Sequence, residues 1–387
     1  MNYLQIVASL LTPNILGLIL LGVVMGIVFG AIPGLNTPIA IALVLPFTYT
    51  LDVLPSIALI LGIYMGGISG GLITAILLKI PGTVSSVATT LDGYPMAKKG
   101  KAAEALAIGT FASFIGGILS CFALMFISPL LSKVAIAFGA WEYFGAAFLA
   151  LSFVCVLMDG KVLKGFIAVF IGFLLATVGV SPIDGTVFRF TFGNMALSGG
   201  FDMISVILGI FALPEMFRTA GKIREEITVT EFKKKWFYLP SRDSLVGQTI
   251  NFVRSALIGI FVGILPGMGP SAAGMVAYSQ AKKSSKYPEK FGTGISDGII
   301  ASETSNNAVT GGAIIPMLVL SIPGDTSTAV ILGALTIQGI TCGPLLVINQ
   351  PDLFKAVVVI ALLANIFMFI VQSSTIRFTS KIISIPR

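Results

Sequence analysis

The sequence predicts an all-α polytopic membrane protein made of two inverted-topology repeats, with helices or re-entrant hairpins that break at Pro-Gly pairs. Three observations predict this fold class. Apolar residues make up 56% of the 387 residues and charged residues only 11%, whereas soluble domains carry about 25% charge. The Pro-Gly pairs recur in the same order in both halves, and the lysine-rich loops change places between the halves.

The composition excludes a soluble enzyme and a nucleic-acid-binding protein, because so few charged residues cannot cover a surface that faces water. The net charge of +7 comes from basic clusters between apolar runs. The sequence contains no histidine, so catalytic triads and metal sites that need histidine are excluded. Cys121, Cys155 and Cys342 lie far apart in apolar segments and are expected to be small buried side chains. The N-terminus lacks a basic region and an A-x-A cleavage site, so no removable signal peptide is expected.

Ten apolar segments are candidate membrane spans, for which about 20 residues are needed. They are Ile15–Ile32, Ile39–Leu51, Ser56–Leu78, Ala105–Pro129, Val134–Met158, Leu163–Val180, Phe201–Phe217, Phe252–Leu265, Ala308–Ile322 and Leu353–Val371. The first, the eighth and the ninth are shorter than a full span and stop at a Pro-Gly pair, and a full-length segment stops at Pro81-Gly82. Because proline breaks a helix, these breaks require protein or a water-filled cavity around the freed backbone.

The breaks form two pairs of related motifs. GIVFGAIPG from Gly26 matches GIFVGILPG from Gly259, and IPGTVSS from Ile80 matches IPGDTST from Ile322. The spacing is 233 residues for the first pair and 242 for the second, which predicts a duplication. We therefore expect a first repeat over residues 1–217, a cytoplasmic linker over 218–254 with an interfacial segment at Glu231–Tyr238, and a second repeat over 255–387. Only 63 residues follow Gly324, against 135 between Gly82 and Phe217, so the second repeat is expected to be incomplete at its C-terminus.

Loop charge predicts that the repeats have opposite orientations. In the first half, Thr48–Pro55 holds only Asp52, while the loop after the second motif holds Lys98, Lys99 and Lys101. In the second half the bias is reversed: the loop after the first motif holds Lys282, Lys283, Lys286 and Lys290, and Gln338–Pro344 has no charge. Lysine-rich loops favour the cytoplasmic side, and a bias that flips between repeats is typical of secondary transporters.

Small hydroxyl, amide and glycine residues follow the breaks and are the candidate substrate-binding residues. They are Gly34, Asn36, Thr37, Gly82, Thr83, Ser85, Ser86, Gly267, Gly269, Ser271, Gly324, Thr326, Ser327 and Thr328. Helix N-termini that begin there would offer unpaired N–H groups and partial positive charge to a carboxylate. The structural alternative is that small residues let helices pack closely, as the spacing of Gly22, Gly26 and Gly30 indicates.

Ionisable residues within the spans are candidates for ion coupling. Asp325 is a potential sodium ligand or proton carrier, and Glu303 forms a polar cluster with Ser302, Asn306 and Asn307. The alternative is that Glu303 reaches the loop that holds Asp297. Lys79 either balances substrate carboxylates or extends to the membrane surface. Asp92, with the lysines that follow it, is expected in a solvated cytoplasmic loop.

The motifs resemble those of a known family. GAIPGLNTPIAIALVLPFTY, GIYMGGISGG, IPGTVSSVATTLDGYPMAKKGKAAEAL, GILPGMGPSAAG and ASETSNNAVTGGAIIPMLVLSIPGDTSTAVILGAL are similar to the large membrane subunit of the tripartite tricarboxylate transporters, whose members usually continue beyond this C-terminus. The resemblance implies a multi-pass importer of the bacterial inner membrane that works with a small membrane subunit and a periplasmic substrate-binding protein. An ion gradient would drive transport, because the sequence has no P-loop for ATP.

The leading hypothesis is thus a secondary importer of citrate-like carboxylates, with no catalytic activity and no cofactor beyond a possible sodium ion. Two alternatives remain open. An intramembrane aspartyl protease would need Asp325 to face a second aspartate, for which Asp202 and Asp297 are the candidates. A passive channel or scaffold would show no dependence on an ion gradient.

Overall fold

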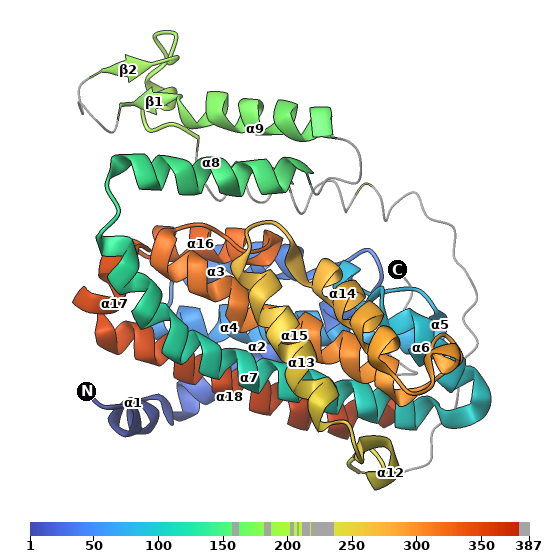
Figure 1. Cartoon of the computed structure of the whole chain (residues 1–387). Coiled ribbons are helices and arrows are strands. Elements are labelled where there is room, and N and C mark those ends of the chain that lie inside the picture. Colours follow the sequence, from blue (N-terminus) through green and yellow to red (C-terminus); the bar gives the residue numbers. More distant parts are fainter. Residues whose placement is uncertain are drawn as a thin grey trace.

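The computed structural model of the chain is almost entirely helical (Figure 1). It describes residues 1–156, 162–181, 187–201, 205–206, 209–210, 217 and 236–378. Within them the strands are β1 (Gly179–Val180) and β2 (Phe188–Arg189), an antiparallel pair. The predicted all-α fold class is confirmed. Most of the Phe201–Phe217 segment, the first part of the linker (residues 218–235, which include the start of Glu231–Tyr238), and the last nine residues lie outside the described residues.

The helices of the first half follow the predicted spans closely as far as Pro129. They are α1 (Tyr3–Leu10), α2 (Pro13–Ala31), α3 (Thr37–Thr48), α4 (Val53–Gly70), α5 (Leu72–Leu78), α6 (Thr89–Met96), α7 (Ala102–Ile136), α8 (Ala140–Val156) and α9 (Val162–Ala176), with the short turns η1 (Val84–Ser86) and η2 (Ala97–Lys101). The turn η3 (Met195–Leu197) also belongs to the first half. The second half contains α12 (Arg242–Leu245), α13 (Thr249–Ile264), α14 (Gly269–Ser284), α15 (Ser296–Leu320), α16 (Thr326–Ile337), α17 (Pro344–Asn349) and α18 (Pro351–Thr375), with the turns η5 (Pro288–Lys290) and η6 (Ile376–Phe378).

Among the described residues, four helical stretches are long and apolar enough to cross a membrane. They are Pro13–Ala31, Val53–Leu78, Thr89–Ile136 and Pro351–Thr375. This supports a polytopic membrane protein, because each provides about the 20 residues that a span needs.

Several predicted boundaries were wrong. The segment Ala308–Ile322 is no short span but the second part of α15, a continuous helix of 25 residues. The first part of this helix is polar, so hydropathy alone did not identify it as part of a span. Neighbouring helices nevertheless bury every residue from Gly298 to Val319. The predicted span Val134–Met158 is divided between the end of α7 and α8, and Leu163–Val180 ends as a helix at Ala176.

The two halves use the same helix packing. Helix α2 lies along α4, and α13 lies along α15. A Cβ added to Gly26 would collide with the carbonyl oxygen of Ile63, and one added to the equivalent Gly259 would collide with that of Ser305. These glycines therefore let helix backbones approach closely, as small residues do inside membranes.

Helices of each half also pack on the long central helix of the other half. Helix α7 of the first half packs on α15, while α18 of the second half packs on α4. Likewise α3 contacts α16, and α14 contacts η1. Neither half therefore buries its own long central helix without the other.

Equivalent helices run in opposite directions. Gln338, just after α16, donates a hydrogen bond of 2.6 Å from Nε2 to the carbonyl of Thr48, before α4 begins. The hydroxyl of Ser321, at the end of α15, donates to the carbonyl of Cys342 at 2.5 Å. The start of α4 and the end of α15 therefore lie at one end of the bundle, as the inverted-repeat prediction requires.

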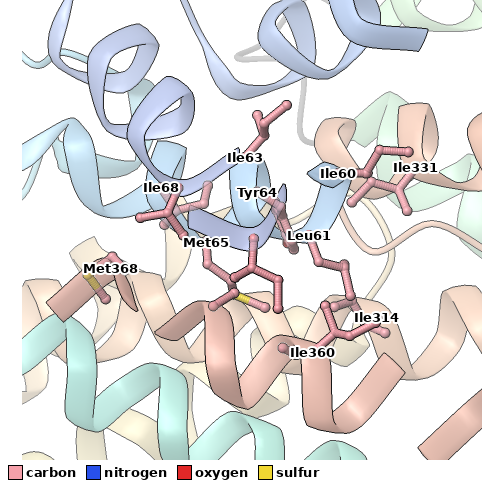
Figure 2. Packing of buried hydrophobic residues seen from close by; sticks show 14 of the residues in the cluster. Ile60, Leu61, Ile63, Tyr64, Met65, Ile68, Ile314, Ile331, Ile360 and Met368 are labelled. Atoms are coloured by element: carbon pink, nitrogen blue, oxygen red, sulfur yellow. The ribbon is translucent and has the colours of Figure 1, made fainter. Parts of the chain in front are cut away.

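An aliphatic cluster fills the space between these helices. Figure 2 shows Tyr64 within this cluster, beside Met65 of α4 and near Ile314 of α15 and Ile360 of α18. Tyr64 is fully buried. Helices α8 and α9 pack on one another and lie apart from this bundle (Figure 1).

Candidate functional site

At the first break of each repeat, Pro33-Gly34 and Pro266-Gly267, the chain turns at a glycine with positive φ. Gly34 has a φ of 97°, and Gly267 has a φ of 79°, which only glycine adopts without strain. After the first, the Asn36 side chain caps α3 by accepting a hydrogen bond of 3.1 Å from the backbone N–H of Ile39. After the second, α14 begins at Gly269 without a side-chain cap. Both breaks therefore start new helices, as predicted.

The second break of each repeat, at Pro81-Gly82 and at Pro323-Gly324, begins with a residue in a strained backbone conformation. Lys79 ends α5 with a φ of 60°, and Ser321 ends α15 with a φ of 57°. The two are 242 residues apart, the same spacing as Gly82 and Gly324. Non-glycine residues are uncommon in this left-handed region, so the duplication preserves the backbone path even where it is strained. Lys79 is exposed, near the Tyr94 ring, and does not lie among the buried polar residues.

Hydroxyl groups gather at the second break of the first repeat. The hydroxyls of Thr83 and Ser85 lie 2.5 Å apart, and that of Ser86 donates to the carbonyl of Thr83 at 2.9 Å. Gly71 makes room for them, because a Cβ there would collide with the Thr83 hydroxyl. All three side chains are buried.

Asp325 occupies the corresponding place in the second repeat and caps α16. Its Oδ1 accepts hydrogen bonds of 2.7 Å from the N–H of Thr328 and 2.9 Å from the Thr328 hydroxyl. Its Oδ2 accepts a bond of 2.8 Å from the Tyr64 hydroxyl. A carboxylate at a helix N-terminus is stabilised by the N–H groups and the helix dipole, and both oxygens of Asp325 are thus engaged by the protein.

Glu303 is the centre of a buried oxygen-rich cluster at the middle of α15. Its carboxylate accepts hydrogen bonds from the hydroxyls of Thr89 and of Ser113, the latter at 2.9 Å. The Asn307 amide donates to the Ser113 hydroxyl at 2.9 Å and to the Asn306 side-chain oxygen at 2.5 Å. Glu303 is completely buried, so the alternative that it extends to the loop of Asp297 was wrong.

Each long central helix reaches the second break of the other repeat. Tyr64 of α4 bonds Asp325, and the Asn306 amide of α15 donates to the carbonyl of Ser85 at 3.1 Å. Tyr64 and Asn306 are themselves 242 residues apart. The structure therefore brings the second breaks of both repeats together through one polar contact from each half.

The first breaks of the two repeats make different contacts with the second breaks. The Gly267 N–H donates to the carbonyl of Gly324 at 2.9 Å, which links the two breaks of the second repeat. Thr37 lies against Gly67 of α4, where a Cβ would crowd its side chain. Ser271 and Thr326 are only partly buried or exposed and form none of the buried polar contacts described above.

Asp92 is placed differently from the prediction. It is completely buried and not part of a solvated loop. Its Oδ1 accepts the N–H groups of Gly292, Gly294 and Ile295 at 2.7–3.1 Å, and its Oδ2 accepts the Tyr278 hydroxyl at 2.8 Å. The sequence concealed this role, because the lysines after Asp92 give the whole segment a solvated composition.

Sequence reasoning also missed Tyr64, Thr89 and Ser113. Thr89 and Ser113 are ordinary helix residues in the sequence, and only the packing of α6 and α7 on α15 brings them to Glu303. Tyr64 could have been found from the repeat, because it is the residue of the first repeat equivalent to Asn306, which was a candidate for ion coupling.

The arrangement does not suit aspartyl protease chemistry. Asp297 lies at the start of α15, and Asp325 follows its end. A helix of 25 residues is about 37 Å long, so these two carboxylates cannot form a pair, and Asp202 lies outside the described residues. Within the described residues, no group of three or more histidine, cysteine or acidic side chains could hold a metal ion.

Comparison with known proteins agrees with this architecture. The model of the TctA family, described as the tripartite tricarboxylate transporter TctA family, matches residues 16–387. The chain belongs to the TctA family. It is therefore a multi-pass membrane component of a tripartite tricarboxylate transporter.

Two relatives of this TctA-family chain come from Agrobacterium vitis. An uncharacterized 52.8 kDa protein of the TAR-I ttuC' 3' region is 37% identical over 377 residues, which are 97% of this chain and 74% of that protein. An uncharacterized protein of the TAR-II ttuC' 3' region is 37% identical over 128 residues, which are 33% of this chain and 53% of that protein. No solved structure matches the chain.

Proposed function

We propose that this chain is the permease of an importer for tricarboxylates or related, citrate-like carboxylates in the bacterial inner membrane. A periplasmic binding protein delivers the substrate, a small membrane subunit completes the complex, and an ion gradient drives transport. The observation that carries this proposal is the buried polar layer in which Tyr64 and Asn306, at equivalent positions, each contact the other repeat's second break. Substrate sites between inverted repeats are the rule for transporters with broken helices.

Glu303 is the group that we propose for ion coupling, together with Asn306 and Asn307. The Glu303 carboxylate is bonded by the hydroxyls of Thr89 and Ser113, while the Asn307 amide N–H lies farther from it, at 3.4 Å. Hydroxyl and carboxylate oxygens are ligands that hard cations accept. Asp325 is less suited to a transported ion, because the N–H of Thr328 occupies one carboxylate oxygen and an N–H cannot bind a cation. A carboxyl group inside a membrane is costly and usually functional.

The deciding experiment is uptake of labelled citrate into proteoliposomes that contain this chain, its small subunit and the binding protein. Sodium and proton gradients are imposed separately. Uptake that follows one gradient and requires the binding protein supports the proposal and identifies the ion. Uptake that persists after both gradients are collapsed indicates a passive channel, and no uptake of any tricarboxylate or dicarboxylate contradicts the proposal.

A further inference from the structure

We propose that the second breaks of the two repeats have different occupants. The break of the second repeat is filled by its own carboxylate, that of Asp325, whereas the break of the first repeat binds a carboxylate of the transported substrate. This inference rests on the proposed function, and it assigns the substrate to one of two related places.

The two breaks are equivalent in detail. A Cβ on Gly82 would collide with the carbonyl oxygen of Gly30, and a Cβ on Gly324 would lie 2.5 Å from that of Gly263. Gly30 and Gly263 are themselves an equivalent pair of the first motif. Thr83 and Asp325, which follow Gly82 and Gly324, therefore occupy corresponding positions.

The second repeat shows what such a position accommodates. The carboxylate of Asp325 is held by the N–H and hydroxyl of Thr328 and by the Tyr64 hydroxyl. The first repeat has Ser86 at the position of Thr328 and Asn306 at that of Tyr64. It thus retains a hydroxyl and a side-chain donor but has no carboxylate, because Thr83 replaces the aspartate.

The first repeat also holds buried hydroxyls that lack partners. Thr37 and Thr74 are each 1% exposed, and neither hydroxyl has a hydrogen-bond partner. The Thr74 hydroxyl lies at Gly82, 2.6 Å from where a Cβ would be. An unpaired buried donor costs about 1–3 kcal/mol, and a carboxylate, which only accepts hydrogen bonds, would satisfy it.

The second repeat lacks these hydroxyls. Proline stands at both corresponding positions, Pro270 for Thr37 and Pro316 for Thr74. Proline side chains donate nothing, and Asp325 already fills that break. Thr74 therefore places an unpaired donor at the break that has no internal carboxylate, which is the arrangement expected if an external carboxylate completes it.

Charge separates the breaks in the same way. A substrate carboxylate approaching α16 would meet the negative charge of Asp325 directly. At the first repeat no acid lies within the break itself, and the neighbouring acid is Glu303, which is bonded to Thr89. Like charges at close range in a poorly polarisable environment repel strongly. The anion is therefore excluded from α16, while at the first repeat the coupling ion that we propose for Glu303 would offset the charge of the neighbouring acid.

The test is to place a tethered carboxylate in the first repeat with Thr83→Asp in the full transporter, and to compare it with the neutral, equally large Thr83→Asn. We expect Thr83→Asp to reduce citrate uptake at least tenfold while its thermal stability stays equal to or above that of the wild type. Thr83→Asn, which removes the hydroxyl but adds no charge, is expected to lose clearly less uptake than Thr83→Asp. Equal uptake by Thr83→Asp and wild type, or equal losses in both variants, would overturn the inference.

A second pair of variants tests the unpaired hydroxyl. Thr74→Val is expected to raise the KM for citrate uptake at least threefold without loss of thermal stability. Ser128→Ala removes another buried unpaired hydroxyl, on α7, and is expected to leave KM unchanged. An unchanged KM for Thr74→Val contradicts the assignment, whereas failure of wild-type uptake contradicts the proposed function itself.

Discussion

At the scale of single residues, equivalent positions of the two repeats have the same backbone conformation but side chains of different chemistry. Lys79 and Ser321 adopt the same left-handed conformation, although one side chain is charged and the other is small. Tyr64 and Asn306 both reach across to the other repeat, one with a hydroxyl and the other with an amide. The duplication therefore retained where side chains are placed, while substitution changed what they can bind.

Glu303→Gln is expected to lower gradient-driven citrate uptake at least tenfold. The substitution keeps the shape of the side chain but removes the negative charge that a coupling cation or proton requires. Uptake is measured in proteoliposomes with each gradient imposed in turn. The matched control, Glu289→Gln, changes an exposed acid and is expected to transport normally; normal uptake by Glu303→Gln would refute the coupling role.

At the scale of helices, two close contacts build each half. In α2 the glycine face packs on α4, and in α13 the matching face packs on α15. The structural alternative for Gly22, Gly26 and Gly30 is thus confirmed: these glycines pack helices. The helix ends are held by polar contacts instead, Asp92 at one end of the bundle and Gln338 at the other.

Gly26→Ala is expected to destabilise the protein by about 1–3 kcal/mol, because the added methyl group would collide with the Ile63 carbonyl in a packed interface. Thermal unfolding in detergent measures this. Gly17→Ala is the control on the same helix, where a Cβ meets nothing within 4 Å. It is expected to be neutral or slightly stabilising, and equal effects of both variants would contradict the packing role.

Asp92→Asn is expected to loosen the loop before α15. The substitution removes a charge that accepts three backbone N–H groups, and we expect a loss of about 1–3 kcal/mol for this contact. Trypsin should then cut faster at the lysines of residues 282–290. Asp243→Asn, at an exposed acid, is the control, and unchanged cleavage in Asp92→Asn would show that the contact does not hold the loop.

At the scale of the whole molecule, the structure sorts the loops by charge. Asp92, shortly before Lys98, Lys99 and Lys101, binds the loop that follows the lysines of residues 282–290. At the other end, Gln338 joins the loops that carry little or no charge. All lysine-rich loops of the bundle therefore lie at one end, which the charge rule assigns to the cytoplasm.

This orientation predicts the accessibility of single cysteines introduced into a cysteine-free variant. In intact cells, a membrane-impermeant maleimide should label Tyr49→Cys and Gly339→Cys, whose loops contain no lysine or arginine and lie at the opposite end. It should label Lys99→Cys and Lys286→Cys only after the membrane is opened. Labelling of Lys99→Cys and Gly339→Cys from the same side would contradict the inverted topology.

Much of the fold could be predicted from local sequence. Proline at the breaks removes a backbone donor and glycine allows positive φ, so the ends of α2 and α13 were placed to within one or two residues. The site could be predicted only in part. Asp325 and Glu303 stood out as charges in apolar sequence, but Thr89 and Ser113 carry no such signal.

The sequence by itself determined the membrane class, the duplication, the positions of the breaks and the family, because composition and periodic motifs express local chemistry. The tertiary structure alone decided that α15 is one continuous buried helix, that Asp92 is a buried anchor and that Asp325 already fills its break. The physical reason is the exchange of helices between the repeats. The partners of Glu303, Asp325 and Asp92 come from distant parts of the chain, and no local pattern specifies such contacts.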